Sequence, residues 1–104
     1  MVYAFVQDVA ASWMRYQAAA RLLDEPTPAG LMLHVAGPTE EGVRMIEIWT
    51  DEEACQRYRA ERLEPVIATL GGPASAEASF RDLHPGHVVI GDIATPTTRE
   101  GARR

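Results

Sequence analysis

Two polar residues, His34 and Glu47, lie in neighbouring apolar runs of the sequence, where they could act together as a base. His34 belongs to the run Leu31–Ala36 and Glu47 to the run Val43–Trp49, and both runs are typical of strands. A carboxylate beside an imidazole fixes the tautomer of the ring and strengthens it as a base. Such a pair could remove a proton from an enolisable, phenolic or 1,3-dicarbonyl carbon acid.

The segment that joins the two runs determines how close the pair comes. Residues 37–42 are rich in glycine, proline and acidic residues, so we expect a tight turn and an antiparallel hairpin. A turn centred on Thr39–Glu40 would pair His34 with Met45 and leave Glu47 as a diagonal neighbour. Moving the turn by one residue on each side would place His34 and Glu47 directly opposite. In either register one hairpin face carries the His, Glu, Trp and Met side chains, and the other carries aliphatic ones.

Side chains on the polar face could line a pocket for a flat, hydrophobic substrate. A tryptophan and two methionines would supply an apolar wall, and two tyrosines could reach in from helices to hydrogen-bond a developing enolate oxygen. The candidate substrate-binding residues are Trp49, Met32, Met45, Tyr16 and Tyr58. All of them, and the His–Glu pair, also have a purely structural interpretation as packing residues and a satisfied polar pair. No metal-ligand spacing is present, so we expect no metal and no other cofactor.

Four or five strands are expected from the alternating apolar and β-branched runs. The predicted strands are Val2–Val9, Leu31–Ala36, Val43–Trp49 and Ala78–Leu83, and His87–Ile90 either continues the last strand or forms a fifth. Two helices are expected between them. The first follows Ser12 as N-cap and ends near Asp24.

The second predicted helix covers residues 51–70, with Thr50 as N-cap and a break or a fresh start at Glu64–Pro65. Spacings of three and four residues give each helix a face. On the first helix the shared face carries Trp13, Tyr16, Gln17, Ala20 and Leu23. On the second, we expect a solvated surface that contains Arg57, Arg59, Glu61, Arg62 and Glu64.

The resulting order β-α-β-β-α-β predicts an α+β fold of ferredoxin-like type. Its four-stranded antiparallel sheet would carry both helices on one face. An exposed, apolar second face favours a partner, so we expect a homodimer in which two sheets stack as a dimeric α/β barrel. The aliphatic side of the hairpin suits that contact, so we expect the His34 side to face the helices.

Length and charge narrow the classes of function. The chain has 104 residues, which predicts one domain, residues 1–91, followed by a polar tail, residues 92–104. A formal net charge of -5 disfavours nucleic-acid binding. The single cysteine, Cys55, fits a reducing compartment, and the absence of a secretory pattern or a membrane-length apolar stretch predicts a cytoplasmic protein that does not bind membranes.

Three short motifs resemble a known family. They are His34–Gly37, Glu47–Trp49 and Thr50–Glu53, all within the segment 30–71. Together they resemble the dimeric α/β-barrel proteins of the antibiotic biosynthesis monooxygenase type, found in natural-product pathways. The resemblance implies the ferredoxin-like fold and a place among cofactor-free oxygenases, polyketide cyclases, lactone isomerases and haem-degrading enzymes, but the fold alone does not choose among these.

Two positions refine what the resemblance implies. Many members carry a histidine four residues after an alanine on the second helix, whereas here Ala54 is followed at that spacing by Tyr58, which argues against haem chemistry. The first strand has Gln7 where some oxygenase relatives use an asparagine, so Gln7 joins the candidate substrate-binding residues.

The sequence thus leads to a hypothesis and two alternatives. The hypothesis is a cofactor-independent enzyme of polyketide-like natural-product metabolism, with His34 and Glu47 as the base and cyclisation, isomerisation or oxygenation as the outcome. The first alternative is a non-catalytic homodimer that binds a small molecule or acts as an accessory protein. The second is a purely structural homodimer.

Overall fold

Alternating apolar residues build four strands that pair in one antiparallel sheet. The computed structural model describes residues 1–72 and 79–91 of the chain. Its strands are β1 (Tyr3–Val9), β2 (Leu31–Pro38), β3 (Val43–Trp49) and β4 (Ser79–Leu83), in the spatial order β2-β3-β1-β4. β3 lies between β1 and β2 and runs antiparallel to both, so the β1-α1-β2 unit is split by a strand, as in ferredoxin-like folds.

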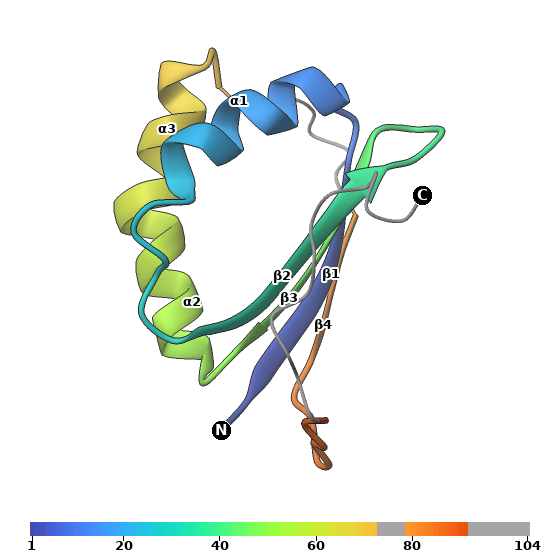
Figure 1. Ribbon diagram of the computed structural model, residues 1–104, viewed down its shortest axis with the longest axis vertical. Coiled ribbons are helices and arrows are strands. Elements are labelled where there is room, and N and C mark those ends of the chain that lie inside the picture. Colours follow the sequence, from blue (N-terminus) through green and yellow to red (C-terminus); the bar gives the residue numbers. More distant parts are fainter. Residues whose placement is uncertain (73–78, 92–104) are drawn as a thin grey trace.

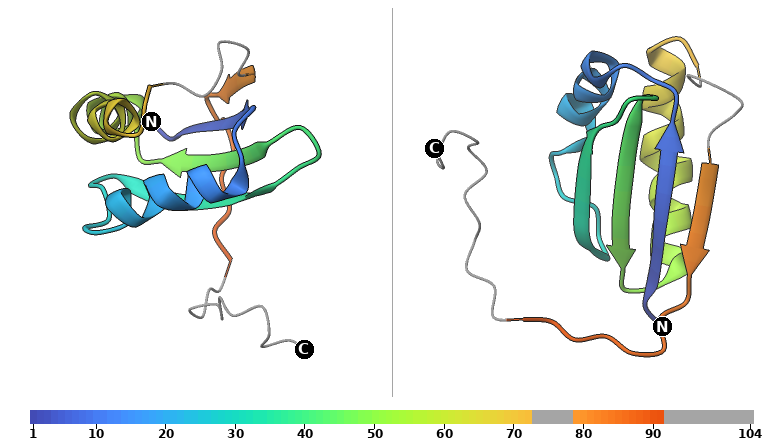
Figure 2. Two further views of the ribbon diagram at one scale, coloured as in Figure 1. Left: turned by 90° about the horizontal axis from the view of Figure 1, so that it is seen from above. Right: turned by 90° about the vertical axis from the view of Figure 1, so that its right-hand side faces the viewer.

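All the helical segments cover one face of the sheet (Figure 1). They are α1 (Trp13–Leu23), α2 (Glu52–Tyr58), the π-helical turn η1 (Arg59–Leu63) and α3 (Glu64–Thr69). α2, η1 and α3 follow one another without a gap, and α3 packs beside α1 (Figure 2). The predicted β-α-β-β-α-β order is confirmed. No helix in the described ranges is both long enough and apolar enough to cross a bilayer.

Local hydrogen bonds explain where the helices begin. Ser12 caps α1 as expected, because its hydroxyl accepts the backbone N–H of Arg15 at 3.0 Å. The predicted cap Thr50 is wrong by one residue, since the carboxylate of Asp51 accepts the N–H of Ala54 at 2.8 Å. The backbone N–H of Thr50 is instead held by the carbonyl of Gly30 at 2.8 Å, which leaves Thr50 outside the helix.

The sequence predicts a break or a fresh start of the second helix at Glu64–Pro65, and the fresh start is confirmed, because α3 begins at Glu64. Pro65 lies in the first turn of α3, where the missing N–H of proline costs no hydrogen bond. The turn before it widens into η1, in which the N–H of Glu64 reaches the carbonyl of Arg59, five residues back. The chain therefore changes helical register at the proline, and α3 starts where the sequence predicted a fresh start.

The hydrophobic core lies at the end of the molecule where α2 meets the sheet. It consists of Tyr3, Phe5, Trp49, Ala54 and Cys55. Gly30 makes the close approach of β2 to α2 possible. It adopts φ +90°, and a Cβ at this position would lie 2.7 Å from the Cβ of Ala54.

Strand register places the apolar residues that face away from the helices side by side. Val35 pairs with Ile46, which pairs with Val6. In the next row, Leu33 pairs with Ile48, Ile48 pairs with Ala4, and Ala4 pairs with Leu83 on β4. We call this set the outer face, and its larger members are exposed in the monomer: Val6, Leu33, Val35, Ile46 and Leu83.

Two predictions concern the C-terminal part of the chain. His87–Ile90 forms no strand and is exposed, because the chain leaves the sheet after Leu83 (Figure 2). β4 begins at Ser79, and the predicted first residue, Ala78, lies outside the described residues, as does the predicted tail, residues 92–104.

Candidate active site

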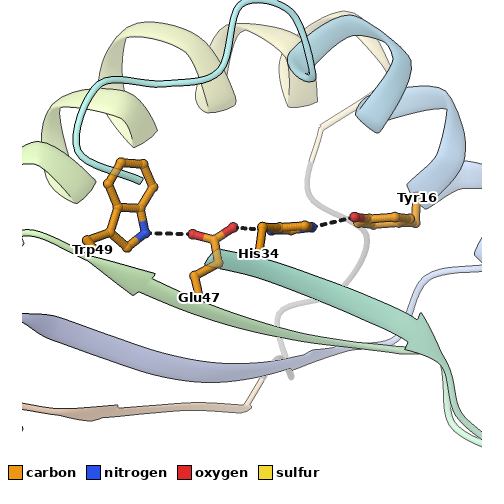
Figure 3. Close-up of polar contacts among 4 residues, drawn as sticks. All are labelled: Tyr16, His34, Glu47 and Trp49. Atoms are coloured by element: carbon orange, nitrogen blue, oxygen red, sulfur yellow. Dashed lines mark hydrogen bonds and ion pairs between the residues drawn. The ribbon is translucent and has the colours of Figure 1, made fainter. Parts of the chain in front are cut away.

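His34 and Glu47 lie directly opposite each other on β2 and β3. Of the two hairpin registers considered above, this is the one with the shifted turn. Both side chains point towards the helices, and Nδ1 of His34 lies 2.6 Å from Oε2 of Glu47. The second carboxylate oxygen, Oε1, accepts the indole N–H of Trp49 at 2.8 Å. Figure 3 shows these side chains in a row beneath the helices.

Tyr16 extends this row from α1. Its hydroxyl lies 2.5 Å from Nε2 of His34, and the two rings are parallel to within 3°. Trp13 stacks on the other side of Tyr16 at a centroid distance of 4.9 Å. The helix face predicted from the sequence therefore brings Tyr16 to the site, with Trp13 as its support.

The donors and acceptors that these groups offer fix the direction of each hydrogen bond in the row. The indole nitrogen of Trp49 can only donate, so Oε1 of Glu47 accepts. A carboxylate accepts on its other oxygen too, so Nδ1 of His34 carries the hydrogen in that contact. The lone pair of the neutral ring is then on Nε2, where it accepts the hydroxyl hydrogen of Tyr16. We call this arrangement the relay; it consists of Tyr16, His34, Glu47 and Trp49.

The relay lies in the wall of a cavity of about 830 Å³ between the sheet and the helices. This volume is typical of sites for drug-sized organic molecules. Most of the lining is apolar, from β1, α1, the loop after α1 and α3. The predicted site residues that line the cavity are Gln7, Tyr16, His34, Met45, Glu47, Trp49 and Tyr58.

Met32 does not line this cavity, contrary to the prediction. The pairing of β2 with β3 is irregular between Leu31 and Leu33, so the strict alternation of side chains fails there. Leu31 takes the inward position and packs against the core, whereas Met32 is exposed.

Burial keeps the two cavity tyrosines protonated. It raises the pKa of Tyr58 to about 12, with the negative charge of Glu47 adding to the effect. Burial also raises the pKa of Tyr16, helped by Asp24 and Glu47. Tyr58 packs against Trp49 at a centroid distance of 5.4 Å. Both phenols are therefore neutral hydrogen-bonding groups at the cavity wall.

Two arginines that were predicted on the solvated surface of the second helix, Arg59 and Arg62, lie elsewhere in the structure. Arg59 lines the cavity, and Arg62 donates to the carbonyls of Leu23 and Pro26, which ties the loop after α1 to η1. Arg15, on α1, also lines the cavity and donates to the carbonyl of Gly72. Charge alternation favoured a surface position for Arg59 and Arg62. The spacing from Cys55 could have placed Arg59, because it follows this buried residue by four positions and therefore shares its helix face.

Cys55 is a buried thiol in the core. Burial raises the pKa of the Cys55 thiol to about 11, which keeps it in the unreactive thiol form. Across residues 1–72 and 79–91, no three histidine, cysteine or acidic side chains come together in a geometry that could hold a metal ion.

Comparison with known proteins gives matches in structure only. No protein-family model matches the sequence, and curated proteins give no significant match. The structure of Rv0793 from Mycobacterium tuberculosis is similar at a TM-score of 0.62 and 14% identity, over 86% of this chain and 100% of that one. SnoaB, a cofactor-independent oxygenase from Streptomyces nogalater, is similar at 0.59 and 14%, over 85% and 96% of the two chains.

A protein named for antibiotic biosynthesis monooxygenase activity, from Deinococcus radiodurans, is similar at a TM-score of 0.61 and 15% identity, over 88% of this chain and 99% of that one. These similarities show that the chain has the ferredoxin-like fold of antibiotic biosynthesis monooxygenase-type proteins. At such identities they carry no residue of the site from one protein to another.

Proposed function

We propose that this protein is a cofactor-independent enzyme that removes a proton from a hydrophobic, polyketide-like carbon acid. The observation that carries the proposal is the relay in the wall of an apolar cavity, which ends in the Nε2 lone pair of His34 and the hydroxyl of Tyr16. The similarity in fold to a cofactor-independent oxygenase supports the same class of reaction.

The proton passes from the substrate to His34 through Tyr16. The lone pair of Nε2 is occupied by the Tyr16 hydroxyl, so the phenolic oxygen takes the substrate proton as its own hydrogen moves to His34. The electron pair of the broken C–H bond stays on the substrate as an enolate. Tyr16 is neutral before and after the transfer, which agrees with its raised pKa. The carboxylate of Glu47 stabilises the imidazolium that forms.

The fate of the enolate sets the overall reaction. Attack on a carbonyl of the same molecule closes a ring, and return of the proton to another carbon isomerises the substrate. With dioxygen from solution, the carbanion forms a C–O bond and a hydroperoxide. Loss of water from that hydroperoxide, with cleavage of its O–O bond, leaves a carbonyl group. All three outcomes begin with the same proton transfer, which is the step that the relay supports.

We also infer that the working form is a homodimer joined through the outer face. Ile46 lies at the centre of this face, between Val6 and Val35, and all three are exposed in the monomer. A contiguous apolar sheet face is stabilised by burial against a second copy of itself. Ile46→Lys should convert a dimer to a monomer in sedimentation equilibrium, whereas Leu22→Lys, at an exposed apolar position on α1, should not. A monomeric wild type would refute this inference.

Anthrone, a flat ketone with one acidic methylene group, is a suitable probe for the proton transfer. Under nitrogen in D₂O, NMR follows exchange of the methylene hydrogens, and under air an oxygen electrode follows any oxygenation. We expect the protein to accelerate exchange. His34→Gln should reduce this acceleration by about 100-fold or more, and Tyr16→Phe should reduce it as well.

The matched control is His84→Gln, because His84 is exposed and does not line the cavity. It should leave exchange unchanged. Saturable binding of anthrone without accelerated exchange would support the alternative, a non-catalytic binding protein. If Tyr16→Phe exchanged as fast as the wild type, His34 would act directly and the transfer through Tyr16 would be wrong.

A further inference from the structure

Arg59 lies in the cavity wall on the opposite side of Glu47 from His34. Across the sheet, His34 pairs with Glu47, and Glu47 pairs with Phe5. The guanidinium of Arg59 lies over the ring of Phe5, 5.8 Å from its centroid, and over the ring of Phe80, 5.6 Å away. The cavity floor therefore has the relay at one end and a positive charge at the other.

This positive charge has aromatic neighbours but no carboxylate partner. In residues 1–72 and 79–91, no acidic oxygen lies within ion-pair distance of Arg59, and its side chain makes no hydrogen bond. The contacts with Phe5 and Phe80 are cation–π contacts, which provide no oxygen acceptor for the N–H groups of the guanidinium. By contrast, the guanidinium of Arg15, the other arginine in the wall, is hydrogen-bonded to the carbonyl of Gly72.

The N–H groups of Arg59, which have no acceptor in residues 1–72 and 79–91, match a planar anion. A guanidinium presents its donors in a fork that fits the two oxygens of a carboxylate. Phe5 lies two strands from His34 in the same row, which corresponds to about 10 Å in the plane of the sheet. That separation is comparable to the length of a fused tricyclic ring system, which Met45 and Trp49, the lining residues on either side of Glu47 in β3, would contact.

We propose that Arg59 forms an anion subsite, so that the preferred substrate is a fused-ring carbon acid that carries a carboxylate at the end remote from its acidic C–H group. The inference rests on the proposed function for the position of the reacting end. It adds a specificity-determining residue, which binds the substrate and takes no part in the proton transfer.

Anthraquinone-2-carboxylate and anthraquinone-2-carboxamide are matched probes, because they share size and shape and differ in charge. Isothermal titration with each compound gives a ratio of dissociation constants. We expect the wild type to bind the carboxylate about tenfold more tightly or better, since hydrogen bonds to charged groups contribute that much. Arg59→Gln should bring the ratio close to one, and Arg59→Lys should keep part of the preference.

The control is Arg57→Gln, which removes a positive charge from an exposed position two residues away and should keep the wild-type ratio. Equal binding of the two compounds by the wild type, or a preference that survives in Arg59→Gln, would overturn the subsite and leave the proton-transfer proposal intact. A preference without anthrone exchange would keep the subsite and refute the enzyme. If neither compound bound, the subsite and the ligand cavity would both be wrong.

Discussion

Replacing Glu47 with glutamine tests the direction of the relay without changing the shape of the side chain. Glutamine has one oxygen and one NH₂ group where glutamate has two acceptors. If the oxygen keeps the indole N–H of Trp49, the NH₂ group faces Nδ1 of His34. His34 must then change tautomer, so that Nδ1 accepts and Nε2 carries the hydrogen. The lone pair that receives the proton of Tyr16 is lost.

The effect on stability can be estimated from the contacts. Each hydrogen bond to the carboxylate contributes about 1.5–3 kcal/mol, against about 0.5–1.5 kcal/mol for a neutral one. Exchanging two such bonds costs about 2–3 kcal/mol, and the smaller penalty for burying an amide offsets part of this. We expect Glu47→Gln to lower the free energy of unfolding by about 1–2 kcal/mol. Glu47→Ala should cost about 3 kcal/mol or more, because the buried indole N–H of Trp49 loses its acceptor.

Two measurements separate stability from chemistry. Urea unfolding gives the free energies, and ¹⁵N NMR of labelled histidine shows which ring nitrogen carries the hydrogen. The chain has three histidines, and His34→Gln identifies the signals of His34. We expect the Nδ1–H tautomer in the wild type and Nε2–H in Glu47→Gln, with catalysed anthrone exchange lowered by about 10²–10⁴-fold.

The tautomer of His34 in the wild type tests the assigned direction of the relay. If neutral His34 carried its hydrogen on Nε2, the relay would run the other way and His34 could not accept a proton through Tyr16. A tautomer as expected, together with undiminished exchange in Glu47→Gln, would show that the relay is structural.

Three further predictions concern stability and reactivity. Gly30→Ala should lower the free energy of unfolding by about 2 kcal/mol or more, because of φ +90° and the contact with Ala54, whereas Gly37→Ala, with open space around it, should have little effect in urea unfolding. Cys55 should react slowly with a thiol reagent in the folded protein and rapidly in urea, because its pKa of about 11 and its burial suppress the thiolate; equal rates would contradict this. In a spectrophotometric titration, phenolate absorbance at pH 10.0, the ordinary pKa of a phenol, should be well below half of its final value, because burial raises the pKa of Tyr3 and Tyr58 to about 12 and also raises the pKa of Tyr16. The stability that the neutral phenols of Tyr3 and Tyr58 contribute is complete below pH 10.0 and is lost as the pH rises towards 12. Half-ionised tyrosines in the folded protein at pH 10.0 would refute the assigned burial of Tyr3, Tyr16 and Tyr58.

Local patterns explain why the strands and the start of α1 could be predicted. Runs of β-branched, aromatic and apolar residues identified β1, β2 and β3, and Ser12 marked a helix start. The cap of α2 was placed one residue early, because Thr50 and Asp51 are both good capping residues. A long-range hydrogen bond from Thr50 to Gly30 made the choice, and no local pattern encodes it.

The sequence by itself determined the fold class and the membership of one sheet face. Alternation along a strand places His34, and with it Glu47 and Trp49, on one side whatever the details of the turn. It failed at Met32, where an irregularity in strand pairing reverses the alternation.

Only the tertiary structure decided how these side chains are connected. The opposed register of His34 and Glu47, the contact of Tyr16 with Nε2 and the inward position of Arg59 each depend on elements far apart in the sequence. Periodicity fixes which side of an element a residue occupies. The distance between two elements and the rotation of one against the other come from packing, here of the helices on the sheet.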